Sequence, residues 1–102
     1  MSLQTQPHSH PSQMLLNNHC NILLCIAEDS DVRLRDMAER VGITERAAFA
    51  IVNDLERASI ITRSRVGRRN QYWIDRSQRL HLPMGSTCLV GDLIDTVLAT
   101  AS

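Results

Sequence analysis

Apolar residues recur every three or four positions in the first half of the chain, which predicts helices there. The first helix is expected from about residue 12 to Glu28, with Ser12 as its N-cap. Its central apolar stripe is Leu16, Cys20, Leu23 and Ala27, and the residues that flank this stripe are Leu15, Ile22 and Ile26. A second helix, from Leu34 to Val41, has its apolar residues at i, i+3, i+4 and i+7. Each helix therefore has one face to bury.

A turn signal separates the second helix from a third. Gly42 can adopt the left-handed conformation that ends a helix, and Thr44 can cap the next one, over about residues 45–58. The apolar stripe of this third helix is Ala48, Ile51, Val52 and Leu55. Two helices joined by a short turn that contains glycine are typical of a helix-turn-helix.

After residue 59 the pattern changes from the helical period to the alternation of a strand. Residues 60–66 and 71–75 are expected to be two strands, joined by a four-residue turn over 67–70. The alternation places Ile61, Arg63 and Arg65 on one face, and Tyr72 and Ile74 opposite Trp73. Because a two-stranded ribbon is barely stable alone, it must pack against the helices as a wing.

The remaining residues predict an irregular segment and one more helix. Pro83 and Gly85 interrupt residues 76–86, and Leu89 to Ala99 has the helical period. The apolar arc of this helix is too wide for one small core to cover, so we expect a two-fold homodimer interface there. Its residues would be Leu89, Val90, Leu93, Ile94, Val97 and Leu98.

These elements predict a mainly α (α+β) fold, a winged helix-turn-helix with a three-helix core, a two-stranded β-wing and a C-terminal helix. We divide the chain into a flexible N-terminal tail (1–11), a winged helix-turn-helix DNA-binding domain (12–79), and a linker with a dimerisation helix (80–102). A length of 102 residues fits one domain.

The distribution of charge adds a candidate partner. The formal net charge is zero, but residues 57–79 carry seven arginines against Asp75 alone. A local basic stretch of this kind favours a nucleic-acid partner. All eleven basic residues are arginine, which binds phosphates and guanine edges with two hydrogen bonds.

The third helix and the wing supply the candidate DNA contacts. In the helix these are Thr44, Glu45, Arg46, Phe49 and Asn53, and in the wing Arg63, Arg65, Arg68, Arg69 and Asn70. Arg46 can bond guanine, Asn53 adenine and Phe49 a thymine methyl group; Glu45 can accept from cytosine or face Arg46. Thr44 at the helix N-terminus can hold a phosphate, and the wing can contact the backbone or a narrow minor groove.

Other roles for these side chains stay open at this point. Phe49 can instead pack inward, and Arg46 can pair with a neighbouring acid. The wing can be a solvated hairpin whose arginines serve solubility. Arg33 and Arg35, which flank the second helix, can clamp phosphates or pair with Asp31, Asp36 or Glu39.

Other chemistries find no support in the sequence. There is no glycine-rich phosphate loop and no nucleophile–base motif, so we predict no enzyme and no catalytic residues. The histidines and cysteines lack the paired spacing of a metal site, so we predict no metal and no cofactor. These residues are His8, His10, His19, Cys20, Cys25, His81 and Cys88. An odd cysteine count, with no apolar membrane span and no signal peptide, predicts a cytoplasmic protein.

Three segments together resemble the MarR/ArsR-like winged helix-turn-helix regulators of bacteria, in particular a small single-domain subgroup. They are Val41–Ala47 (VGITERA), Ile51–Ala58 (IVNDLERA) and Arg65–Tyr72 (RVGRRNQY), and the likeness covers about His19 to Leu98. Ser59 stands where this family usually has glycine. The resemblance implies a homodimeric transcriptional regulator that binds double-stranded DNA. There are two alternatives. One is a protein–protein interaction module, and the other is a sensor with a small-molecule pocket between dimer helices.

Overall fold

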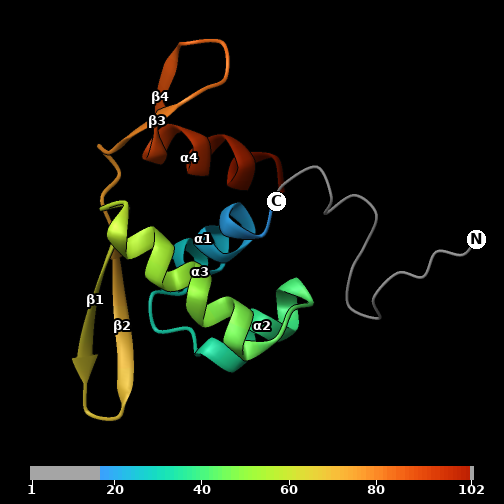
Figure 1. Ribbon diagram of the computed structural model, residues 1–102, viewed down its shortest axis with the longest axis vertical. Coiled ribbons are helices and arrows are strands. Elements are labelled where there is room, and N and C mark those ends of the chain that lie inside the picture. Colours follow the sequence, from blue (N-terminus) through green and yellow to red (C-terminus); the bar gives the residue numbers. More distant parts are fainter. Residues whose placement is uncertain (1–16, 102) are drawn as a thin grey trace, which may run out of the picture.

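The structure, a computed structural model, describes the backbone of residues 17–101 and the side chains of residues 17–99. Three helices are followed by two β-hairpins and a last helix (Figure 1). The elements are α1 (Asn18–Glu28), α2 (Leu34–Val41), α3 (Glu45–Arg57), β1 (Ile61–Val66), β2 (Arg69–Ile74), β3 (Arg79–His81), β4 (Thr87–Leu89) and α4 (Val90–Ala101). This arrangement confirms the predicted winged helix-turn-helix.

Helix α1 begins later than the sequence pattern predicts. Its N-cap is Asn17, whose side-chain oxygen accepts a hydrogen bond from the backbone N–H of Cys20 at 2.9 Å. The predicted cap Ser12, the predicted tail (1–11) and the two leucines at 15 and 16 lie outside the described residues. Ile22 and Ile26, expected beside the stripe, are among the most buried residues of the helix.

The helix-turn-helix forms as its turn signals predict. Gly42 adopts the left-handed conformation at φ 87°, and its N–H donates to the carbonyl of Ala38 at 2.8 Å. The hydroxyl of Thr44 accepts a hydrogen bond from the N–H of Ala47 at 3.0 Å and caps α3. These contacts set the angle at which α3 leaves α2.

The end of α3 places Ser59 at a position where glycine is preferred. Ser59 has a φ of 62°, in the left-handed region. Its N–H donates to the carbonyl of Glu56, and the N–H of Ile60 donates to that of Leu55, both at 3.0 Å. This pair of bonds is the Schellman motif, in which glycine is preferred because a Cβ atom is strained there. Ser59 therefore occupies a glycine position at an energetic cost.

The wing has a shorter turn than predicted. Strands β1 and β2 are antiparallel with Val66 opposite Arg69, so the turn is the two residues Gly67 and Arg68. Gly67 has a φ of 64°, as the first central residue of a type II′ turn requires. Arg69 and Asn70, expected in the turn, belong to β2. The tight turn lengthens β2 by two residues at its start, compared with the strand that the sequence pattern predicts.

A second hairpin occupies part of the segment that the sequence pattern predicted to be irregular. Strands β3 and β4 are antiparallel, with Leu80 opposite Cys88, and Pro83 and Gly85 lie in the loop between them. Three-residue strands are too short to produce a readable alternation, which is why this hairpin escaped prediction. In Figure 1 it extends beyond α4, at the end of the molecule away from the wing tip.

Helix α4 packs into the same core as the first three helices. Val90 and Ile94 are 0% and 1% exposed and belong to the cluster that contains Ile22, Met37 and Val52. The backbone carbonyl of Arg76 accepts from the N–H of Gly91 at 2.9 Å and fastens the start of the helix. Val90 and Ile94 therefore cannot form the dimer interface predicted for them, because their own subunit buries them.

Candidate nucleic-acid interface

One face of α3 is exposed in the first half of the helix and partly buried at Asn53. Arg46, Phe49, Ala50 and Asn53 recur at i, i+3, i+4 and i+7, opposite the buried stripe of the helix. Phe49 is 49% exposed, so it does not pack inward. Arg46 is exposed and makes no ion pair with any residue in the described part of the chain. This face is free to meet a partner.

The wing joins this face through Arg63. Its Nη2 donates to Oε1 of Glu56 at 2.8 Å and to Oδ1 of Asn53 at 3.1 Å. The guanidinium also lies 5.8 Å from the centre of the Phe49 ring, within cation–π range. Glu56 balances the charge of this half-buried group, so Arg63 holds the wing against α3 rather than presenting a free cation.

From the sequence, Arg63 is a predicted DNA contact and Asn53 a predicted adenine reader. The structure places the two together, so the side-chain oxygen of Asn53 accepts from Arg63 while its amide N–H groups remain as donors. Glu45, expected to face Arg46 or a base, lies 3.9 Å from Nε of Arg35 on α2. Both side chains of that pair are mostly exposed, so the pair is weak and either can turn to a partner.

The wing arginines divide into two groups. Arg65 and Arg68 are exposed on the ribbon and its turn. Arg69 instead donates from Nη2 to the backbone carbonyl of Asp31 at 2.6 Å, and the N–H of Tyr72 donates to the carbonyl of Ser30 at 3.0 Å. These two bonds fasten β2 to the loop between α1 and α2.

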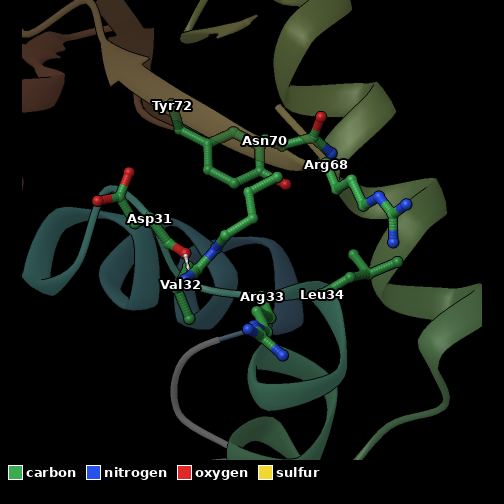
Figure 2. A pocket seen from close by; sticks show the side chains of 8 residues that line it. Asp31, Val32, Arg33, Leu34, Arg68, Asn70 and Tyr72 are labelled. Atoms are coloured by element: carbon green, nitrogen blue, oxygen red, sulfur yellow. Dashed lines mark hydrogen bonds between the residues drawn. The ribbon is translucent and has the colours of Figure 1, made fainter. Parts of the chain in front are cut away.

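This junction creates a pocket that sequence reasoning missed. It has a volume of about 440 Å³ and lies between the start of α2 and the wing (Figure 2). Arg33, Arg68 and Arg69 line it, together with Asn70 and Tyr72. Alternation along the strand placed Tyr72 on the face opposite Trp73, but no pattern indicated that the loop after α1 approaches the wing.

The remaining titratable groups form no second site in the part of the chain that the structure describes. His19 on α1 bonds Asp54 on α3 at 2.9 Å, and this bond, together with Arg57, holds the pKa of Asp54 below its usual value. Burial raises the pKa of the Cys20 and Cys25 thiols, which makes them poor nucleophiles. No cluster of three metal-ligating side chains occurs among the described residues, and His8 and His10 lie outside them.

The three helices, the turn between α2 and α3 and the β-ribbon beside them define a winged helix-turn-helix protein. Residues 15–62 match the family model described as winged helix-turn-helix DNA-binding. The matched segment contains α1 to α3 and the start of β1, and the match supports DNA binding by this motif. Comparisons with curated proteins and with solved structures find no significant match. None of the helices over the described residues is long and apolar enough to cross a membrane.

Proposed function

We propose that this protein is a sequence-specific double-stranded DNA-binding regulator of the MarR/ArsR-like kind, acting as a homodimer. The observation that carries the proposal is the contact of Arg63 with Asn53 and Phe49, because it joins the exposed face of α3 to the wing. An α-helix fits the major groove of B-DNA, about 12 Å wide, while an adjacent ribbon follows the backbone.

The side chains divide between reading bases and holding phosphates. Arg46 and Phe49 are the base-reading candidates, because they project from the exposed face near the start of α3. Asn53, one turn further on, has amide donors for a base acceptor such as N7 of adenine. The hydroxyl oxygen of Thr44 accepts the hydrogen bond that caps the helix, but the hydroxyl can still donate its hydrogen to a phosphate oxygen.

Phosphate contacts come from elements on either side of α3. Arg65, Arg68 and Asn70 belong to the wing, and Arg33 and Arg35 flank the start of α2. Both arms are cationic, while α3 carries the groups that distinguish bases. Contacts of this kind position a protein on DNA without reading its sequence.

Homodimerisation would bring two reading helices to half-sites one helical turn apart, about 34 Å. Leu93 and Val97 on α4 stay only partly buried beside the core residues of that helix. Next to α4, Leu82 and Met84 in the β3–β4 loop are 42% and 92% exposed. We propose that these four side chains, with Leu89 and Leu98, form the two-fold interface in place of the buried pair.

The dimer is tested by the mass of the full chain in solution. Leu93→Glu with Met84→Glu should convert a dimer to a monomer in light scattering, and circular dichroism should show that the monomer is folded. A variant that does not fold would instead show that Leu93 belongs to the core of its own subunit. A wild-type chain that is monomeric at high concentration would contradict the dimer.

DNA binding is tested by fluorescence anisotropy on duplexes enriched from a random pool. The affinity should fall steeply with salt, and the double variant Arg65→Ala, Arg68→Ala should lower the log–log salt slope by about 2. The loss should be similar for all sequences, whereas Arg46→Ala should change which sequence is preferred. Arg79→Ala, on the other hairpin, is the matched control.

A second candidate function is a protein-interaction module that uses the same α3 face. The exposed Phe49 beside the carboxylate of Glu45 favours it, because an apolar ring with an acidic neighbour suits a protein surface. Wing variants separate the two functions. Unchanged duplex affinity in the Arg65→Ala, Arg68→Ala protein would favour this second function over DNA binding.

A further inference from the structure

The pocket between the wing and the start of α2 has the charge of a binding site for an anion. Three guanidinium groups, those of Arg33, Arg68 and Arg69, line it against the single carboxylate of Asp31. Figure 2 shows this carboxylate at the opposite side of the pocket from Arg68. The lining therefore carries two net positive charges, and Arg68 lies away from the acid.

A hydroxyl with no partner among the described residues also belongs to this pocket. Tyr72 is 2% exposed, and in Figure 2 its ring lies on the β2 side of the pocket, between Asp31 and Arg68. Its hydroxyl has no hydrogen-bond partner within the described part of the chain. Solvent can still reach the hydroxyl oxygen, because none of the described side-chain oxygens or nitrogens is both fully buried and unpaired. A hydroxyl in this position can donate a hydrogen bond to an acceptor atom of a bound ligand.

The walls of the pocket limit the size and character of the ligand. Val32 is 5% exposed and Leu34 is partly buried, and with the Tyr72 ring they are the apolar parts of the lining. A volume of about 440 Å³ lies in the range of small-molecule sites. The ligand should combine a compact apolar body with a strongly charged group.

We propose that this pocket binds a small phosphomonoester dianion through Arg33, Arg68 and the Tyr72 hydroxyl. A phosphomonoester carries nearly two negative charges at neutral pH and several strong acceptor oxygens, which matches the two net charges and the free donor. A DNA backbone phosphate is a diester with one charge, so it matches this lining less well. Arg69 stays bonded to Asp31 and contributes its charge from a fixed position.

Occupancy of the pocket would oppose DNA binding. This step rests on the proposed function, which assigns Arg33 and Arg68 to backbone phosphates. A ligand that holds both guanidinium groups removes them from the DNA surface. Duplex affinity should therefore fall when the pocket is saturated at constant ionic strength, whereas ligand binding itself requires no DNA.

The experiment titrates the full-length protein with phenyl phosphate, followed by calorimetry, without DNA. Saturable binding is expected, weakened about tenfold in both Arg68→Ala and Tyr72→Phe, because each removes a hydrogen bond to a charged group. Arg65→Ala, on the same ribbon but outside the pocket, should bind as the wild type does. Circular dichroism establishes that the Tyr72→Phe variant is folded.

Three comparisons can overturn the proposal. The first is equal binding by the wild type and the Arg68→Ala and Tyr72→Phe variants, or none by the wild type. The second is equal affinity for phenyl sulfate, a monoanion of the same shape, since the charge match would then be wrong. The third is equal affinity for inorganic phosphate, which has no apolar body. A protein that binds phenyl phosphate but no duplex would sustain the pocket and refute the proposed function.

Discussion

The wing and the β3–β4 hairpin are both antiparallel ribbons, yet they present opposite chemistry. The wing ends in exposed arginines, whereas the loop of the other hairpin exposes Leu82 and Met84. They extend toward opposite ends of the molecule in Figure 1. The charged end suits a polyanion and the apolar end suits another copy of the chain, so the fold separates two kinds of surface.

Each hairpin is also fastened by an arginine that the sequence alone would group with the exposed ones. In the wing, Arg63 binds Glu56 on α3. Before β3, Arg76 binds Asp95 on α4 at 2.5 Å and the carbonyl of Gly91 at 3.2 Å. In these two hairpins, the arginines bonded to a helix carboxylate hold the hairpin to the fold, whereas Arg68 at the wing turn stays available to a ligand.

The largest expected effect tests how tightly the second hairpin region is joined to α4. A Cβ atom at Gly91 would lie 2.9 Å from Cβ and 3.1 Å from the carbonyl oxygen of Arg76. Gly91→Ala should therefore destabilise the protein by about 2 kcal/mol, because neither atom can move without the backbone. Urea unfolding measures it.

The control for Gly91 is Arg76→Ala, which removes an exposed ion pair and should cost under about 1 kcal/mol. If Gly91→Ala were neutral, the start of α4 would not be packed on the Arg76 backbone as described.

The next effect tests the fastening of the wing. Arg63→Met keeps the length of the side chain but removes its bonds to Glu56 and Asn53, and should cost about 1 to 2 kcal/mol. Duplex affinity should fall as well, because the wing loses its fixed position beside α3. Thermal unfolding and anisotropy measure the two effects.

Arg65→Met provides the contrast for Arg63→Met on the same strand face. It should leave stability within about 0.5 kcal/mol of wild type while still reducing duplex affinity. Equal stability of the two variants would mean that Arg63 is not a fastening residue.

A smaller and opposite effect is expected at the junction between α3 and the wing. Ser59→Gly should stabilise the protein by about 1 kcal/mol, because glycine adopts the left-handed conformation without strain. The gain is partly offset by the greater freedom of glycine in the unfolded chain. Ser64→Gly, in a strand, should destabilise instead, and denaturant midpoints distinguish the signs.

The smallest effect concerns acid stability away from both hairpins. The hydrogen bond with His19 lowers the pKa of Asp54 in the folded state. Its stabilising contribution is therefore complete above the unfolded pKa, about 3.9, and is lost as pH falls through the lower folded value. Asp54→Asn should therefore reduce the fall in the free energy of unfolding between neutral pH and about pH 3. Urea unfolding at a series of pH values measures this difference.

The matched control for Asp54 is Glu39→Gln on the exposed side of α2, which should keep the wild-type pH dependence. An Asp54→Asn protein with an unchanged curve would show that the His19 bond does not form in solution.

Much of the fold could be predicted because its signals are local. Gly42 and Thr44 mark the helix-turn-helix, and the change of period after residue 59 marks the wing. The site was less predictable. The sequence left open whether Phe49 is exposed, and the partners of Arg63 and Arg69 lie 7 and 38 residues away in sequence. No local pattern encodes such pairings.

The order of residues by itself determined where helices and strands lie, which faces are apolar, and that positive charge gathers after α3. Only the folded chain decided which arginines are bonded to its own carboxylates and carbonyls. It also decided which apolar residues of α4 are already buried in the core. The physical reason is that periodicity and turn conformation depend on neighbouring residues, whereas the burial and pairing of a side chain depend on whatever segment the core brings beside it.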